Sequence, residues 1–171
     1  MKEKAKVILR RADVYDPALV ARIIREGIDE FGVASRIKGK VTIKPNVVMA
    51  HHKVTPSAYT RPEFLDGLLT ALEEKAQGEA EFSVAEKCGA AIPTSRMFRR
   101  AGYYRLRKKH RFKLRPIEEA RKKTVRLDKG KIHQKIRTSC EIADRDFLIY
   151  APKLKTNALA HGLTAALKLN I

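Results

Sequence analysis

The feature that most constrains the fold of this chain is the alternation of short apolar runs with amphipathic stretches. Residues 6–11, 41–43, 80–85 and 147–150 have the length and composition of β-strands. The residues between these runs include stretches with apolar side chains three and four positions apart, as on one face of a helix. We therefore predict an α/β fold, in which a mostly parallel sheet lies between flanking helices in three layers.

Local signals indicate where the first two helices begin. Asp16 and Pro17 can serve as the N-cap and first residue of a helix whose apolar period continues to Phe31. Thr60 and Glu63 have the Thr-x-x-Glu spacing of a capping box ahead of a second helix. The residues before it, 47–59, form a loop.

Three further elements are predicted in the second half of the chain. We expect a helix from Ser95 to about Tyr104, and a last helix over 158–170 that Asn157 caps. Between them, two strand-like runs flank the turn at 128–130 and predict a β-hairpin near 124–137 that lies against the main body.

The length and composition favour one domain. The chain has 171 residues, which we assign to a single α/β domain over residues 1–171. No apolar run is long enough to span a bilayer, and the amino end lacks a signal-peptide core, so we expect a cytoplasmic protein. Cys88 and Cys140 are the two cysteines, and this chain alone offers no disulfide framework and no zinc or iron-sulfur ligand set.

The positive charge is concentrated in one segment. Residues 96–126 hold fourteen Lys or Arg and two Glu, a charge of +12 out of the total of +18. A segment of this density attracts phosphate backbones, anionic membranes or acidic proteins, and Tyr103, Tyr104 and Phe112 could stack on bases. No nucleic-acid-binding motif accompanies it, so the alternative is a solvated basic face.

Polar side chains follow three of the predicted strands, and ligands of open α/β sheets bind at the carboxyl ends of strands. Lys44 and Asn46 follow the strand at 41–43, and Glu86 follows the strand at 80–85. Lys153 and Lys155 follow the strand at 147–150. We expect these five side chains to converge on one crevice.

The predicted last helix carries a further polar stripe of His161, Thr164 and Lys168, for which a solvent-exposed face is the alternative. The amino end of this helix would add to the positive charge of Lys153 and Lys155 and favour an anion there. The adjacent His51 and His52 are expected at the surface rather than at a metal. Dinucleotide-binding, P-loop, α/β-hydrolase and zincin motifs are not found in the sequence.

Several short motifs, in this order, resemble the domain of unknown function 362 family. They are Ile43-Lys44-Pro45-Asn46, Tyr59-Thr60-Arg61-Pro62, Ala85-Glu86-Lys87 with the small-residue loop that ends at Thr94, Ala101-Gly102-Tyr103, Ala151-Pro152-Lys153-Leu154-Lys155-Thr156-Asn157 and the segment 162–168. The resemblance extends from about Val7 to Ile171.

The resemblance implies little about chemistry, because the family is largely uncharacterised. Some members are iron-sulfur proteins through a separate cysteine-rich segment, which this chain lacks. Many relatives have histidine at the position of Asn157 and continue beyond the segment that ends at Ile171. We therefore expect a domain incomplete at its C-terminus, which would self-associate or pair with a partner chain.

Two classes of function remain open, together with a third role. The first is the binding of a phosphorylated or carboxylated small molecule, with catalysis left undecided. Glu86, Lys153 and Lys168 are then the acid–base or nucleophilic candidates, and the ligand would be held by Lys44, Asn46, Arg61, Thr94, Lys155, Asn157, His161 and Thr164. The second is nucleic-acid binding through 96–126. The third is an association with an iron-sulfur partner.

Overall fold

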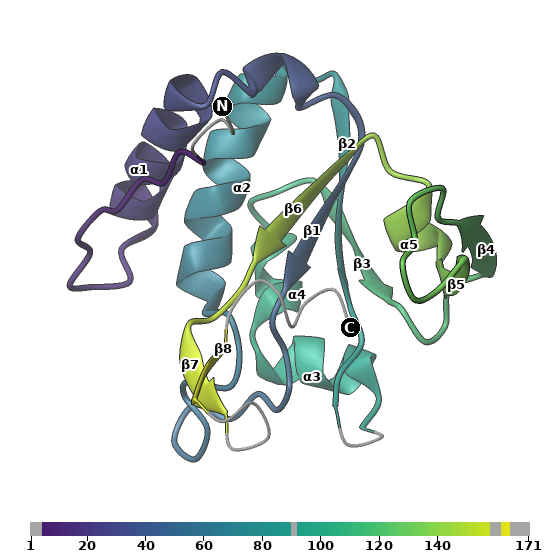
Figure 1. The fold of residues 1–171 in the computed structure, drawn as a ribbon. Coiled ribbons are helices and arrows are strands. Elements are labelled where there is room, and N and C mark those ends of the chain that lie inside the picture. Colours follow the sequence, from purple (N-terminus) through teal and green to yellow (C-terminus); the bar gives the residue numbers. More distant parts are fainter. Residues whose placement is uncertain (1–4, 90–91, 158–161, 165–171) are drawn as a thin grey trace.

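The computed structural model describes residues 5–89, 92–157 and 162–164 (Figure 1). Within them, four parallel strands form one sheet in the order β3-β2-β1-β6. The strands are β1 (Gly39–Pro45), β2 (Ala80–Glu86), β3 (Phe112–Pro116) and β6 (Phe147–Ala151). Helices flank this sheet, so the predicted α/β class is confirmed.

The central strand β1 has one apolar and one polar face. Val41 and Ile43 are fully buried in the hydrophobic core. Thr42 and Lys44 are also buried, but successive side chains of a strand point to opposite faces of a sheet. The neighbouring strands repeat this alternation in register, because Val41 lies opposite Phe82 in β2.

Two long helices cover the apolar face, α1 (Pro17–Glu30) and α2 (Pro62–Ala76). Figure 1 shows both on the same side of the sheet. The predicted start of α1 is confirmed, since the Asp16 side chain accepts a hydrogen bond from the amide of Ala18 at 2.8 Å. The two helices approach closely at Gly67, whose position leaves no room for a Cβ beside Pro17 and Val20.

The predicted helix from Ser95 to Tyr104 is divided in two. It forms α3 (Thr94–Arg100) and α4 (Tyr103–Leu106), which are separated at Gly102 with a φ of 81°. This left-handed conformation suits glycine and ends a helix. A short 3₁₀ helix, η1 (Ala34–Arg36), leads into β1.

The predicted hairpin is confirmed and covers the polar face of the sheet. It consists of the antiparallel strands β4 (Lys122–Arg126) and β5 (Lys135–Ser139), and α5 (Cys140–Ala143) follows it directly. The Thr42 hydroxyl donates to the carbonyl oxygen of Glu141 in α5 at 3.1 Å. Figure 1 shows this unit on the side of the sheet away from α1 and α2, which completes the three layers.

Two strand predictions need correction. Residues 6–11 form no strand, and Val7 and Leu9 are 76% and 85% exposed. No strand in the described part of the chain pairs with this run, which lies along α1 (Figure 1), where Lys6 and Arg10 contact Glu30 and Glu26. The strand β6 lies at one edge of the sheet and is half-buried, instead of being covered on both faces.

The predicted last helix is wrong where the structure describes it. Residues 162–164 form strand β8 (Gly162–Thr164), which pairs antiparallel with β7 (Lys155–Asn157). Asn157 therefore belongs to a strand instead of capping a helix. The other residues predicted in this helix, 158–161 and 165–170, lie outside the described residues. In the described part of the chain, no helix has the length and apolar character needed to cross a membrane.

The contact at Gly67 gives a test of the packing of α1 on α2. An added Cβ at this position would lie 2.7 Å from the Cβ of Val20, so Gly67→Ala should destabilise the protein by about 1–3 kcal/mol in urea unfolding. Gly27→Ala in α1 is the matched control, because nothing lies within 4 Å of its added Cβ. The control should be neutral or stabilising, and equal losses from both variants would contradict the packing described.

Candidate functional site

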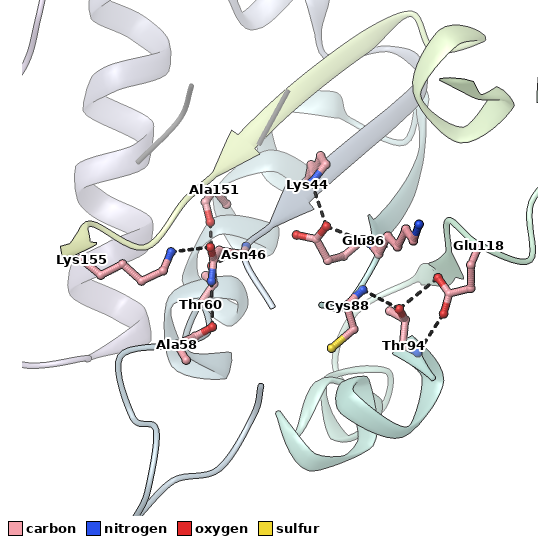
Figure 2. Close-up of polar contacts among 11 residues, drawn as sticks. Lys44, Asn46, Ala58, Thr60, Glu86, Cys88, Thr94, Glu118, Ala151 and Lys155 are labelled. Atoms are coloured by element: carbon pink, nitrogen blue, oxygen red, sulfur yellow. Dashed lines mark hydrogen bonds and ion pairs between the residues drawn. The ribbon is translucent and has the colours of Figure 1, made fainter. Parts of the chain in front are cut away.

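A buried ion pair joins the carboxyl ends of β1 and β2. The Lys44 Nζ donates to the Oε1 of Glu86 at 2.8 Å, and the two side chains are 10% and 7% exposed (Figure 2). The same oxygen accepts the amide of Lys87 at 2.8 Å. Burial raises the pKa of Glu86, although the charge of Lys44 offsets part of the effect. Glu86 thus holds its proton to a higher pH than a free carboxyl group does.

This ion pair borders a cavity of about 700 Å³ between the polar face of the sheet and the β4–β5 hairpin. The residues come from the ends of β1, β2 and β6, from the loop after β3 and from the hairpin and α5. They are Lys44, Glu86, Lys87, Cys88, Ile117, Glu118, Lys122, Val125, Ile136, Arg137, Thr138, Ser139, Ile142, Ala143 and Tyr150. The hairpin and the sheet border this open space on two sides, and we call it the hairpin cavity.

The charges around the hairpin cavity are mostly positive. Glu86 is neutralised by Lys44, and Glu118 is the other acid of the lining. Lys87, Lys122 and Arg137 are exposed cations of the same lining. Among the described residues, no ion pair involves any of these three, so they can contact an anion in the cavity.

One wall of the hairpin cavity is fixed by Thr94 at the start of α3. Its hydroxyl accepts the amide of Cys88 at 2.7 Å and donates to Glu118 at 3.0 Å, and its own amide donates to Glu118 at 2.9 Å (Figure 2). Burial, together with Glu86 and Glu118, raises the pKa of the Cys88 thiol. The thiol therefore stays protonated and donates to the Val48 carbonyl at 2.7 Å.

Asn46 and Lys155 meet on the other side of the end of β1, next to β6. The Lys155 Nζ donates to the Oδ1 of Asn46 at 2.7 Å, while the Asn46 side-chain amide donates to the Ala58 carbonyl at 2.8 Å (Figure 2). The Thr60 hydroxyl accepts the amide of Asn46 and donates to the carbonyl of Ala151. The Thr60 side chain thus bonds to Asn46 and Ala151. The predicted capping box does not form, because Arg61 and not Thr60 is the N-cap of α2.

Arg61 and Lys153 gather around Tyr15. The Lys153 Nζ donates to the Tyr15 hydroxyl and lies 4.8 Å from the ring centroid, and the Arg61 guanidinium lies 5.6 Å from it. Arg61 also pairs with Glu63 at 3.2 Å, and this contact raises the pKa of Arg61. Tyr15 had no signal in the sequence that would link it to these cations.

The structure thus divides the predicted crevice into separate clusters. Lys44 and Glu86 meet at the border of the hairpin cavity. Thr94 is not part of the lining, but it hydrogen-bonds to Glu118, which is. The sequence did not indicate the role of Glu118. Asn46 meets Lys155, and Arg61 meets Lys153. The structure places Thr164 in the backbone of β8, and the predictions for the Asn157 side chain, His161 and Lys168 lie outside the described residues.

The structure shows no metal centre in the residues that it describes. No group of three or more His, Cys, Asp or Glu side chains among them could hold a metal ion, and Cys88 and Cys140 are free. His51 and His52 lie in the loop before α2 with stacked rings, and His51 accepts the amide of Val54 at 3.0 Å. An iron-sulfur association stays a prediction.

The model of a family described as Domain of unknown function (DUF362) matches residues 41–171, most of the chain. The matched region begins with β1 and contains the ion pair and the hairpin cavity. Neither a curated protein nor a solved structure matches the chain.

The ion pair predicts a pH-dependent loss of stability in Lys44→Met. The substitution leaves a buried carboxylate without its cation, which costs about 3 kcal/mol at neutral pH. A carboxyl whose folded-state pKa is raised contributes stability below its unfolded pKa and loses it as the pH rises through the folded pKa. The deficit in urea unfolding should therefore shrink on acidification and grow toward neutral pH.

Two further variants control this experiment. Lys44→Met combined with Glu86→Gln removes the unpaired charge, so much of the lost stability should return at neutral pH. Lys113→Met breaks the exposed Lys113–Glu81 pair between β3 and β2, and should change the stability little. A deficit of Lys44→Met that is independent of pH would contradict the burial of Glu86 as a charged partner.

Proposed function

We propose that this chain, which belongs to the DUF362 family, binds a phosphorylated or carboxylated small molecule in the hairpin cavity. The observation that carries the proposal is the buried Lys44–Glu86 pair on the border of that cavity. Burying such a pair does not stabilise a fold more than apolar residues of the same volume would. A role in binding or chemistry accounts for its presence at the ends of two central strands.

The size and place of the hairpin cavity support this function. Its volume of about 700 Å³ lies within the range of small-molecule sites. It lies at the carboxyl ends of β1, β2 and β6, where ligands of parallel sheets bind. The apolar side chains of the hairpin and α5, including Val125, Ile136 and Ile142, would exclude water from one side of a ligand.

The cations around the cavity define the charge of the ligand. Arg137 offers a planar group that can bind two oxygens of a phosphate or carboxylate at once. Lys87 and Lys122 supply two further positive charges from the end of β2 and the start of β4. The hydroxyl groups of Thr138 and Tyr150 can hydrogen-bond the uncharged part of the molecule.

The ion pair also provides acid–base chemistry. Glu86 has a raised pKa and is suited to exchange a proton with a bound molecule. The Lys44 ammonium, 2.8 Å from Glu86, would stabilise negative charge on the reacting group. Lys153, which was also a catalytic candidate, contacts Tyr15 and is not part of the cavity lining.

Calorimetric titration with pyrophosphate and with succinate tests the proposal. Binding of either anion should weaken at least about tenfold in Arg137→Gln, since a charge-assisted hydrogen bond contributes about 1.5–3 kcal/mol. Arg126→Gln is the matched control, because it removes the same charge from the same hairpin and Arg126 does not line the cavity. Both variants change exposed residues and should fold normally.

Three outcomes would overturn the proposal. The first is that neither anion binds to the wild-type protein. The second is that Arg137→Gln and Arg126→Gln weaken binding equally, which would indicate a general effect of net charge. The third is that amide shifts on adding anion map to Arg61 and Lys153 instead of to β5 and the end of β2.

A further inference from the structure

A second surface of the protein carries cations that the hairpin cavity does not use. Residues 94–111 contain eight Lys or Arg and no Asp or Glu. The structure places this stretch in α3, α4 and the turn after α4, and all eight cations are exposed: Arg96, Arg99, Arg100, Arg105, Arg107, Lys108, Lys109 and Arg111. We call this region the α3–α4 surface.

Seven of these cations have no acidic partner in the part of the chain that the structure describes. Lys109 is the exception, since its Nζ lies 2.8 Å from Asp66. Two of the others, Arg99 and Arg100, also lie in the last turn of α3, where cations favour the helix dipole. The dipole of α3 does not account for Arg105, Arg107 and Lys108, which place three further positive charges on α4 and the turn that follows it.

The turn after α4 is held rigidly on the body of the protein by His110. The imidazole is buried, with Nε2 at 2.7 Å from Asp66 and Nδ1 at 2.8 Å from Glu73, both in α2. The amide of Arg111 also donates to Glu73, at 3.0 Å. Because the backbone of the turn is fixed, its exposed cations would lose less freedom when they bind a partner.

The aromatic residues of this region differ in their exposure. Tyr103 and Phe112 are buried in the core, so the prediction that they stack on bases is wrong. Tyr104 is 37% exposed, and the Arg99 guanidinium lies 5.7 Å from its ring centroid. An exposed ring beside an arginine is a platform on which a base can stack, whatever its identity.

We propose that the α3–α4 surface binds single-stranded nucleic acid through its phosphates, with one base stacked on Tyr104. An anionic membrane is the less favoured partner. Among residues 92–116, Tyr104 is the only large apolar side chain that the structure exposes, so the surface has little to insert between lipids. The abundance of arginine over lysine also suits bidentate contacts to phosphate.

Fluorescence anisotropy with a labelled oligouridylate of about 20 nucleotides tests this proposal. Binding by the wild-type protein should weaken steeply between about 50 and 200 mM salt. A variant with Arg100, Arg105, Arg107 and Lys108 changed to Gln should bind more weakly at every salt concentration. Its slope of log affinity against log salt should be smaller by about 3, because single strands give about 0.7 per phosphate contact.

A charge-matched variant separates this surface from the effect of net charge. Arg22, Lys38, Lys129 and Lys131 are exposed cations elsewhere on the protein, and changing these four to Gln should leave the salt slope unchanged. Tyr104→Ala should weaken binding of the oligouridylate about tenfold, and binding of an RNA duplex much less. Tyr104→Phe should retain the stacking.

The proposal is overturned if the wild-type protein does not bind the oligonucleotide at low salt, or if the two fourfold variants lose equal affinity. It is also overturned if the α3–α4 variant loses binding to vesicles of anionic phospholipid while its binding to the oligonucleotide is unchanged. Circular dichroism of both variants checks that they fold. Arg137→Gln, in the hairpin cavity, should not alter the binding of the oligonucleotide.

Discussion

The two faces of β1 have opposite chemistry, and the rest of the structure follows from this constraint. Val41 and Ile43 require an apolar cover, which α1 and α2 supply. Lys44 lies on a strand that is buried from both sides, and a buried ammonium group costs several kcal/mol unless a counter-charge meets it. Glu86 at the end of the neighbouring strand supplies that charge, and the hairpin with α5 covers the polar face without filling it.

The elements that could be predicted from sequence are those in which the spacing of apolar residues matches the face that is buried in the fold. The apolar period of α1 and the runs in β1, β2 and β6 gave the correct elements, because burial and local pattern agree there. The strand β3 was not predicted, since Phe112–Pro116 has charged residues between its apolar ones and ends in proline. Residues 6–11 have a strand's composition, but a strand also needs a partner, which local sequence does not specify.

The candidate site could be predicted in part for a related reason. The rule that ligands bind at the carboxyl ends of strands correctly selected Lys44 and Glu86 as neighbours. It could not tell that Asn46 and Lys155 meet each other instead, because Asn46 lies just beyond the end of β1 and Lys155 lies in the separate strand β7, whose course does not follow from the alternation along β6. Glu118 and Tyr15 reach their partners only through the tertiary fold, so no spacing in the sequence indicates them.

The position of β6 in the sheet has a consequence for the order of assembly. The strands β1, β2 and β3 are joined by crossovers between neighbours, whereas β1 meets the start of β6 through contacts such as Lys40–Asp146, which are 106 positions apart. Contacts of such high sequence separation form late and slow the folding of a domain. The hairpin cavity, which is lined by Tyr150 and by the hairpin, is therefore complete only when both parts have folded. If the proposed anion binds there, it would stabilise the whole native domain against unfolding instead of one local element.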